Sequence, residues 1–278
     1  MKIALTLLVR DEFDVIQTMI DYHIKRGIDH FVITDNGSKD STIEILNDFA
    51  RSDQIMLLHE PPSDFSQHRW VTRMAHIAQD MFQADWIFHA DADELFVPMG
   101  SRTIKEILLE VEEEIQVLKI DRHDFVAFNR KYYAPPQIEM IYRKSESLNL
   151  GGRPLPPKVI HRPIQNVKVT QGNHGIDVET NPRSASIDAL RIYHYPIRSY
   201  KQFATKVSNG GSGYSLNKEL PKNTGFHKRH WYQLLQDGKL EELFFAKYHY
   251  SDAEVKIALS EGIIVEDNTI SQFIKCTL

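Results

Sequence analysis

Three carboxylates stand within four positions directly after a short apolar run. The run Trp86–Phe88 is too short for a helix and is rich in aromatic and β-branched residues, which is typical of a buried strand. Asp91, Asp93 and Glu94 follow it. Mutual repulsion makes such a cluster unfavourable unless a cation lies beside it. Hard oxygen ligands favour Mg²⁺ or Mn²⁺, which typically bring a phosphate with them. A solvated acidic turn is the alternative, and the strand directly before the acids favours the metal site.

Length and composition are those of an ordinary globular protein. The chain has 278 residues, 42% of them hydrophobic and 26% charged, enough for one elaborated domain or a domain with an appendage. The formal net charge of −5 argues against a general nucleic-acid binder. No apolar run approaches the roughly 20 residues that span a bilayer. The opening segment 1–9 is followed at once by charged residues, so we interpret it as a strand rather than a signal peptide. Cys276 is the only cysteine, which excludes an intrachain disulfide, and we expect a cytoplasmic setting.

Strands and helices alternate through the first 120 residues. Apolar runs predict strands at 2–9, 31–34, 55–58, 86–88 and 117–120, and helical periodicity predicts helices around 15–24, 42–49, 70–82 and 104–115. Ser41 with Glu44, and Thr103 with Glu106, have the pattern of capping boxes. Strict alternation predicts a parallel sheet with right-handed crossovers, and ligands of such sheets bind at the carboxyl ends of the strands.

The pattern changes after residue 120. Helical periodicity fades, prolines cluster, and short strand-like runs occur near 138–142, 158–161 and 166–170. We therefore predict an elaborated mixed sheet, one further strand at 190–193 and a helix that begins near Arg198. The last 50 or so residues have helical spacing of apolar positions. Asn209–Gly213 is predicted to be a flexible loop or hinge.

Three segments of the first half together resemble a known family. Strand one ends in Leu8-Val-Arg-Asp-Glu12, strand two leads into the turn of Phe31–Thr42, and the acid run is His89–Glu94. In order and spacing these segments resemble the signatures of a family 2 glycosyltransferase of the GT-A fold. The resemblance implies an α/β fold with a Rossmann-like, mostly parallel sheet flanked by helices, a mixed-sheet elaboration and a helical C-terminal tail. We accordingly divide the chain into a GT-A domain (1–197) and a helical extension (198–278). Within the GT-A domain, 1–120 would bind the nucleotide sugar and 121–197 would face the acceptor.

The resemblance also implies an activity. It implies a metal-dependent enzyme that moves a sugar from a UDP- or GDP-linked donor to a hydroxyl of a glycan or glycolipid, in surface polysaccharide or glycoconjugate synthesis. Thr6 and Arg10 of strand one, and Asp35 after strand two, would contact the nucleotide. Asp91 would lie near the ribose or the metal, and Asp93 would be the principal metal ligand. Breaking the sugar–phosphate bond leaves a diphosphate whose growing charge Mg²⁺ or Mn²⁺ can stabilise.

Several basic residues are further candidates for donor binding. Arg69 and Arg73 are four positions apart, so they share one face of their helix, which could point at a diphosphate or be a solvated basic face. Lys158 lies in a proline-stiffened basic segment that could line a phosphate or be an ordinary loop leading into a strand. Glu94 either acts on the metal through water, orients the site or is a surface acid. Lys206 either meets the diphosphate or lies at the surface.

Two histidines and two aspartates complete the candidate site. Some enzymes of the resembling fold use a C-terminal histidine as a further metal ligand, and His174 is our candidate, with His194 second; an ordinary hydrogen-bonded histidine is the alternative. An inverting transfer needs a general base near the acceptor hydroxyl. The usual acidic motif is not visible after residue 120, so Asp124 and Asp177 are the candidates. The resemblance suggests inversion, and this departure leaves retention open.

Three other classes of protein are alternatives to this one. A sugar-phosphate nucleotidylyltransferase usually has a glycine-rich loop after its first strand, and residues 7–12 contain no glycine. A phosphatase of the haloacid dehalogenase type would carry its Asp-X-Asp after the first strand, not the fourth. A non-catalytic nucleotide-sugar or glycan-binding module would bind without forming product. The expected partners are a nucleotide-sugar donor and an acceptor; nucleic acid and a transmembrane segment are not expected, and peripheral membrane contact stays open.

Overall fold

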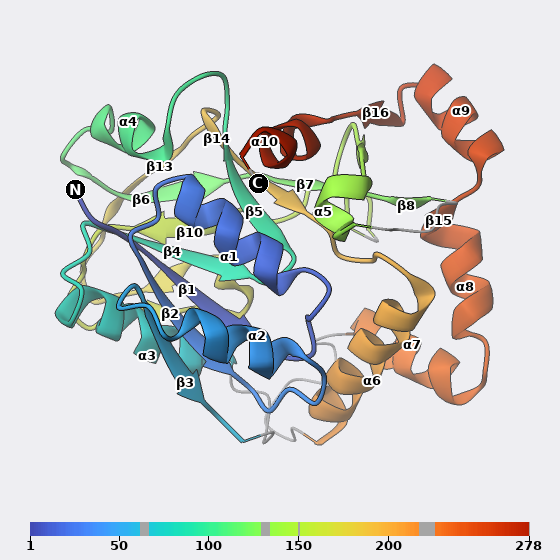
Figure 1. Cartoon of the computed structure of the whole chain (residues 1–278), viewed down its shortest axis with the longest axis horizontal. Helices are drawn as coiled ribbons and strands as arrows, with labels where there is room; N and C mark the ends of the chain where they lie inside the picture. The colour runs from blue at the N-terminus through green and yellow to red at the C-terminus, as the bar shows by residue number, and fades with distance from the viewer. Residues whose placement is uncertain (62–66, 129–133, 150, 217–225, 278) are drawn as a thin grey trace. The chain divides into compact units, whose positions relative to one another are not determined.

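A computed structural model describes residues 1–61, 67–128, 134–149, 151–216 and 226–277 (Figure 1). The described residues form two compact units. The first unit contains the described residues 1–61, 67–123, 146–149 and 151–194, and the second contains 124–128, 134–145, 195–216 and 226–277. The predicted acid run lies in the first unit, and the predicted helical tail belongs to the second. The predicted division into domains at residue 197 stays a prediction.

A seven-stranded sheet is the centre of the first unit, in the order β13-β6-β10-β4-β1-β2-β3. Strand β1 pairs in parallel with both β2 and β4, and β2 pairs in parallel with β3. Strand β10 runs antiparallel between β4 and β6. The strands are β1 Ile3–Val9, β2 His30–Asp35, β3 Ile55–His59, β4 Trp86–Asp91, β6 Ile115–Ile120, β10 Lys158–His161 and β13 Arg183–Ser186.

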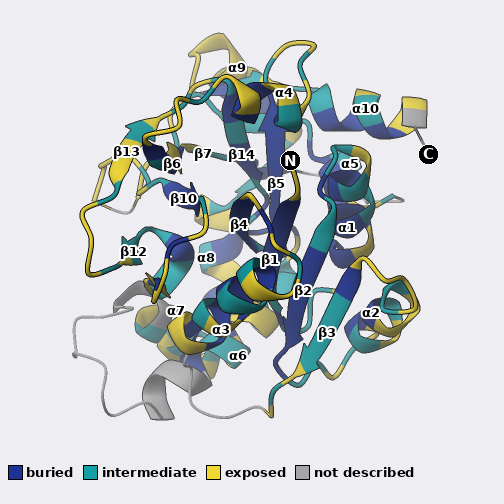
Figure 2. Ribbon diagram, turned by 90° about the vertical axis from the view of Figure 1, so that its left-hand side faces the viewer, coloured by how far each residue is buried: buried dark blue, intermediate teal, exposed yellow. Residues whose placement is uncertain are grey.

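Helices cover both faces of this sheet. Figure 2 shows α3 on one side of the strands and α1 and α2 on the other. Strand β1 is almost wholly buried and reads as a continuous apolar run, as expected for a central parallel strand covered on both faces. The face of α3 that carries Val71, Met74 and Ala75 packs against Ala4 and Ile87 of the sheet. The helices are α1 Ile16–Lys25, α2 Thr42–Phe49, α3 Gln67–Asp80 and α4 Ile104–Leu109.

A smaller sheet brings distant segments of the first unit to the end of β4. Its strand order is β5-β14-β7, and β14 runs antiparallel to β5 so that His194 is opposite Glu94. The bounds are β5 Glu94–Pro98, β7 Arg122–Asp124 and β14 Leu190–His194. A separate hairpin of β11 Lys168–Val169 and β12 Ile176–Asp177 encloses the 3₁₀ helix η1 Gln171–Asn173.

The second unit is mainly helical, with two short strand pairs. Strand β15 pairs in parallel with β8, and β16 pairs antiparallel with β9. No helix among the described residues is long and apolar enough to cross a membrane. The elements are β8 Ala127–Phe128, α5 Pro136–Glu139, β9 Tyr142–Lys144, α6 Tyr200–Leu216, α7 Phe226–Gln236, α8 Leu240–Lys247, β15 His249–Tyr250, α9 Asp252–Ser260, β16 Ile264–Glu266 and α10 Thr269–Thr277.

The mostly parallel α/β sheet flanked by helices confirms the predicted fold class, but the glycine-rich segment was predicted wrongly. Asn209–Gly213 lies inside α6 rather than in a loop. The glycine at position 211 serves close packing, because a Cβ atom there would lie 2.3–2.5 Å from side-chain atoms of Tyr232 in α7. A glycine in a helix costs about 1 kcal/mol relative to alanine, and the contact between α6 and α7 explains why this one is nevertheless helical.

The predicted helix caps and element bounds agree with the structure in some places and differ from it in others. The capping box of Thr103 and Glu106 is present, with Thr103 accepting from the Glu106 backbone. Ser41 makes no side-chain cap; instead the Asp40 carboxylate accepts from the Thr42 backbone N–H at 2.9 Å. Ile115 opens β6 rather than ending a helix, because α4 stops at Leu109. Residues 138 and 139, the start of the strand-like run predicted near 138–142, belong instead to the short helix α5, with proline at the position where helices tolerate it best.

Candidate active site

The carboxyl ends of three strands meet at one edge of the main sheet. In the register of the sheet, Leu8 is opposite Asp91 and Val9 is opposite Asp35. The residue after β1 is Arg10, so the predicted convergence of the three strand ends is present in the structure. This edge is where open α/β sheets bind their ligands.

A buried lysine stands among the carboxylates at the end of β4. Because β10 runs antiparallel to β4, its first residue, Lys158, lies at the β4 carboxyl end. The Lys158 Nζ is 2.6 Å from Asp91 Oδ2 and 2.5 Å from Glu94 Oε2. Glu94 Oε2 also accepts from the Asp91 backbone N–H at 3.1 Å, and Glu94 Oε1 is 3.8 Å from Arg122 Nη1. We call Asp91, Asp93, Glu94, Lys158 and Arg122 the acid cluster.

The charges of the acid cluster shift one another's pKa values. Burial acts to raise the pKa of Asp91, but the Lys158 ammonium outweighs it and lowers that pKa. Burial raises the pKa of Glu94, with Lys158 opposing the shift. Burial acts to lower the pKa of Lys158, and the two carboxylates reverse this and raise it. Lys158 is therefore a permanent ammonium ion at neutral pH, and Asp91 a carboxylate.

Asp93 has a different neighbour. Its side chain is 3% exposed, and its Oδ1 is 3.7 Å from His194 Nε2 at the end of β14. The antiparallel pairing of β14 with β5 explains this contact, since it places His194 beside the first residue of β5. Of the two histidines considered from the sequence, the second choice is the one that lies against an acid of the cluster.

His174 is held by the backbone. Its Nδ1 lies 2.9 Å from the Pro157 carbonyl oxygen, so Nδ1 carries the proton and Nε2 has a free lone pair. The ring packs on Gly172, where a Cβ atom would come within 2.8 Å of it. Burial lowers its pKa, and the charges of Arg122 and Lys158 act in the same direction. His174 thus lies near enough to the acid cluster for the charges of the cluster to shift its pKa. Its role as a metal ligand stays a prediction.

The predicted nucleotide contacts lie at or near the same edge, each with a partner in the protein. Asp35 is buried, and its carboxylate accepts from the backbone N–H groups of Gly37 at 3.1 Å and Ser38 at 3.3 Å. The Thr6 hydroxyl is 2.7 Å from His89 Nδ1 within the sheet. Arg10 Nε lies 3.8 Å from a carboxylate oxygen of the next residue, Asp11. Their contacts with a nucleotide stay predictions.

The remaining predicted residues are spread more widely. Arg73 Nη1 is 2.6 Å from the carboxylate of Glu60, and Arg69 is exposed on the same helix. Asp177 is exposed on β12 in the first unit, whereas Asp124 is buried and belongs to the second unit. Lys206, also in the second unit, donates to the Pro196 carbonyl at 3.3 Å.

The donor set fits a metal that binds together with a phosphate. Among the described residues, no group of three or more His, Cys, Asp or Glu side chains is arranged to hold a metal ion by itself. Mg²⁺ rarely uses such a cage and usually binds one or two carboxylates plus substrate phosphates and water. Asp93 and His194, with the oxygen of the partly exposed Asp91 that does not contact Lys158, are oxygen and nitrogen donors of the kind that Mn²⁺ and Mg²⁺ accept.

Comparison with known families identifies the chain. The model of glycosyltransferase family 92 matches residues 6–239, most of the chain. The chain belongs to glycosyltransferase family 92. The predicted glycosyltransferase is thereby confirmed, and its family is 92 rather than 2. The matched region includes the whole acid cluster and His194.

Solved structures with some similarity are distant from this family 92 chain. The UDP-GlcNAc complex of residues 1–349 of Staphylococcus aureus TarS has 14% identity and a TM-score of 0.48, covering 89% of this chain and 74% of that one. Glucosyl-3-phosphoglycerate synthase of Mycobacterium tuberculosis, with Mn²⁺, UDP and glucosyl-3-phosphoglycerate, has 16% identity and a TM-score of 0.31, covering 50% and 47%. No curated protein matches.

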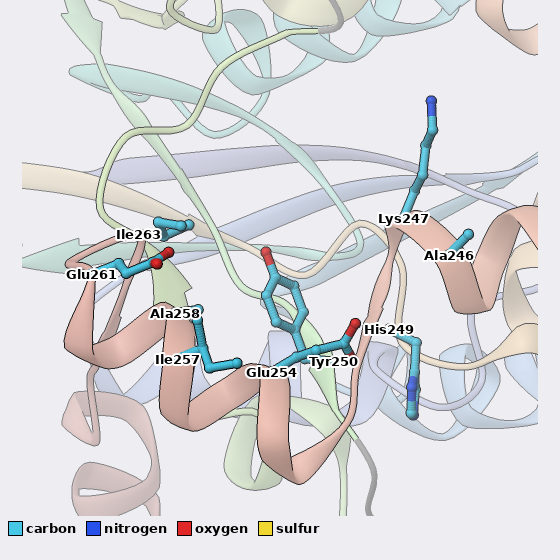
Figure 3. Close-up of a pocket in the computed structure, with 9 residues that line it drawn as sticks. All are labelled: Ala246, Lys247, His249, Tyr250, Glu254, Ile257, Ala258, Glu261 and Ile263. Carbon is cyan, nitrogen blue, oxygen red and sulfur yellow. The ribbon is translucent and has the colours of Figure 1, made fainter.

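The family 92 chain also has a surface pocket in its second unit, made of residues beyond the matched region. This pocket has a volume of about 260 Å³. Its lining residues come from the end of α8, strand β15 and helix α9 and the turn that follows (Figure 3). Ile257 and Ile263 are about half exposed beside it. Its charged side chains include Lys247, Glu254 and Glu261.

Sequence reasoning missed two features of the site. Arg122 was missed, although it stands two residues after the end of β6, which was a usable signal. The pairing of Lys158 with Asp91 and Glu94 was not foreseen, because it depends on β10 entering the sheet antiparallel to β4.

Proposed function

We propose that this family 92 glycosyltransferase moves a sugar from a UDP- or GDP-linked donor to a hydroxyl of a glycan or glycolipid, and that Mg²⁺ or Mn²⁺ is bound at Asp93 and His194. The observation that carries the proposal is the contact of Asp93 Oδ1 with His194 Nε2, 3.7 Å apart, beside Asp91 at the carboxyl edge of the sheet. Family membership supports the reaction class, and this pair of side chains supports the proposed cation site.

The reaction breaks the bond between the sugar C1 and the phosphate oxygen and forms a bond from C1 to the acceptor oxygen. The metal, when bound, offsets the charge that builds on the leaving diphosphate. Asp93 and His194 would hold it, and Asp91 would add one oxygen. The acceptor hydroxyl loses its proton to a base, for which Asp124 and Asp177 remain our candidates. Direct attack by the acceptor would invert the configuration at C1.

Surface polysaccharide or glycoconjugate synthesis is the setting that we infer for this transfer. Two of the alternatives raised by the sequence would give other products or none. A nucleotidylyltransferase would release pyrophosphate from a nucleoside triphosphate, and a binding module would release nothing. Membership of a glycosyltransferase family favours transfer over both.

A thermal-shift series with UDP and GDP tests the proposal. The acidic edge should repel a diphosphate unless a cation bridges them, so we expect stabilisation only when Mn²⁺ or Mg²⁺ is present. A ligand at 100 times its Kd stabilises by about 2.7 kcal/mol, which is easily measured. Equal stabilisation in EDTA would contradict the metal bridge. If neither nucleotide stabilises the protein under any condition, the proposed donor class is wrong.

A further inference from the structure

Lys158 is a buried charged side chain at the proposed metal site, and it contacts two of the carboxylates there. It is 1% exposed and lies within 2.6 Å of carboxylate oxygens from both Asp91 and Glu94. We propose that Lys158 is a positioning residue that keeps Glu94 and one oxygen of Asp91 away from the metal. The divalent cation is then left to Asp93, His194 and the other Asp91 oxygen. This inference rests on the proposed metal-dependent transfer and replaces the direct donor contact predicted for Lys158.

The main chain around Lys158 is fixed from two sides. Arg122 Nε donates to the Pro156 carbonyl at 3.3 Å, and His174 Nδ1 donates to the Pro157 carbonyl at 2.9 Å. Lys158 itself is paired with Ile120 of β6 in the sheet. Three successive residues are thus anchored, so the ammonium group is presented to the carboxylates from a rigid base.

The contacts use up the oxygen of Glu94 that faces Asp91. Glu94 Oε2 interacts with the Lys158 ammonium and also accepts from the Asp91 backbone N–H. Glu94 Oε1 is buried, has no hydrogen-bond partner among the residues that the structure describes, and lies 3.8 Å from Arg122 Nη1. To reach a metal at Asp93, Glu94 would have to break its contact with Lys158 and leave that buried ammonium with Asp91 alone, which is unfavourable.

Asp91 is restrained on one side only. Its Oδ2 accepts from Lys158, while the side chain as a whole is 38% exposed. One oxygen therefore remains for a ligand. Mg²⁺ and Mn²⁺ take six ligands, whereas Ca²⁺ takes six to eight oxygens and often binds carboxylates through both oxygens. By withholding three carboxylate oxygens, Lys158 favours the smaller cation and leaves room for the diphosphate.

The direction in which the metal affinity changes when Lys158 is removed distinguishes this role from donor binding. Lys158 and Arg122 together offset two of the three carboxylate charges in the cluster. Removing the ammonium makes the site more negative and releases oxygens, so the metal should bind more tightly. Removing a lysine that contacts the diphosphate would instead weaken donor binding and leave the affinity for the metal unchanged.

The test compares Lys158→Met, Glu94→Gln and Asp93→Asn by the affinity for Mn²⁺ and Ca²⁺, measured by electron paramagnetic resonance and by competition. We expect Lys158→Met to bind Mn²⁺ at least threefold more tightly than the wild-type enzyme does, and its affinity for Ca²⁺ to rise by a larger factor. Its kcat should fall at least tenfold because Asp91 is misplaced. Glu94→Gln should leave the Mn²⁺ Kd within threefold. Asp93→Asn, the positive control, should weaken Mn²⁺ at least tenfold.

Stability gives a second readout that does not require activity. Lys158→Met alone leaves a buried carboxylate without its partner and should lower Tm by roughly 5–10 °C, while Lys158→Met with Glu94→Gln should recover most of that loss. If Lys158→Met does not fold, Glu94→Gln still decides the matter, because a tenfold loss of Mn²⁺ affinity would make Glu94 a ligand and overturn the proposal. Weaker metal binding by Lys158→Met, or a donor KM raised tenfold at unchanged kcat, would overturn it as well.

Failure of the proposed function is distinguishable from failure of this inference. If the wild-type enzyme binds no Mn²⁺ with or without UDP or GDP, the proposed function fails and this inference with it. If the wild-type enzyme binds Mn²⁺ and Asp93→Asn does not, the proposed function stands. In that case the result with Glu94→Gln or Lys158→Met overturns or supports the role of Lys158 alone.

Discussion

The acid cluster of the first unit and the surface pocket of the second unit hold the same kinds of side chain in opposite settings. Glu94 and Lys158 are 0% and 1% exposed and 2.5 Å apart. Glu261 and Lys247 of the pocket are both exposed, and neither has an ion pair with any residue that the structure describes (Figure 3). The carboxylate of Glu254 in the pocket is already used, since it accepts from the Ser251 backbone N–H at 2.8 Å in a capping box.

The difference lies in what each arrangement costs the fold. Taking an ion out of water costs several kcal/mol even after the protein relaxes, and apolar replacements of buried ion pairs are often neutral or stabilising. An exposed carboxylate costs almost nothing and needs no partner. A buried lysine between two carboxylates at a ligand-binding edge is therefore an indication of function, whereas mixed charges around a surface pocket are not.

The largest effect that we expect from this contrast is the loss of transfer activity when Asp93 is replaced. Asp93→Asn keeps the shape of a buried side chain but removes the charge beside His194, so we expect the fold to persist and the rate of transfer to fall on the order of 10²-fold or more. The measurement is release of nucleoside diphosphate at saturating Mn²⁺, with Tm as the check on folding. Glu261→Gln in the pocket is the matched control and should change the rate less than twofold. Near-normal turnover by Asp93→Asn would remove Asp93 from the site.

The next largest effect is a pH dependence of stability, which comes from buried histidines of the first unit. Burial lowers the pKa of His23 and of His161 to about 4 in the folded first unit, against about 6.5 in an unfolded chain. Below pH 6.5 the unfolded state binds protons that the folded state rejects, so stability falls as the pH falls from 6.5 toward 4. At pH 5 each histidine should cost about 2 kcal/mol of unfolding free energy relative to pH 8.

Urea unfolding at pH 8, 6.5 and 5 checks this, with hydrogen exchange of peptides from β10 reporting on the first unit. His161→Asn should flatten the pH dependence, although its stability at pH 8 will be lower. His249→Asn is the control from the second unit, because His249 is only partly buried. A pH dependence that stays unchanged in His161→Asn would show that other groups carry the acid sensitivity.

The sequence was sufficient where function depends on neighbours along the chain. Asp91, Asp93 and Glu94 follow one strand directly, so their meeting at the sheet edge required only the β/α pattern. Their partners come from far away. Lys158 reaches Asp91 across 67 positions because β10 enters the sheet antiparallel, and no periodicity in the sequence specifies that pairing.

Glycine and serine were misread for a related reason. A glycine-rich run usually indicates a loop, but packing against Tyr232 overrides local preference in α6. Ser41 has the capping-box spacing, yet it makes no side-chain cap, and the neighbouring Asp40 accepts from the Thr42 backbone N–H at the start of the helix. In both cases several local solutions were available, and tertiary contacts selected one of them.

A smaller effect distinguishes the two candidate histidines. His194 contacts Asp93, whereas His174 donates to the Pro157 carbonyl. A ligating imidazole tilts preference toward Mn²⁺, which accepts nitrogen more readily than Mg²⁺ does. We expect His194→Ala to weaken activation by Mn²⁺ roughly tenfold, with a smaller change for Mg²⁺, a loss of about the size seen when one partner of a charged hydrogen bond is removed. His174→Ala should mainly lower Tm. The reverse pattern would restore His174 as the ligand.

The smallest expected effect is in the pocket itself. Ile257 is 55% exposed on α9, so Ile257→Ser gives up little buried apolar area and should change the unfolding free energy by no more than about 0.5 kcal/mol. Because the pocket lacks buried, paired charge, we also expect Mn²⁺ affinity and hydrolysis of the donor to stay within twofold of the wild-type values. Both are measured in the assays already used for Asp93→Asn. Transfer to an acceptor is the sensitive comparison. If that step falls tenfold in Ile257→Ser while hydrolysis of the donor is unchanged, burial and charge pairing are an incomplete guide to function in this molecule, and the pocket takes part in holding the acceptor.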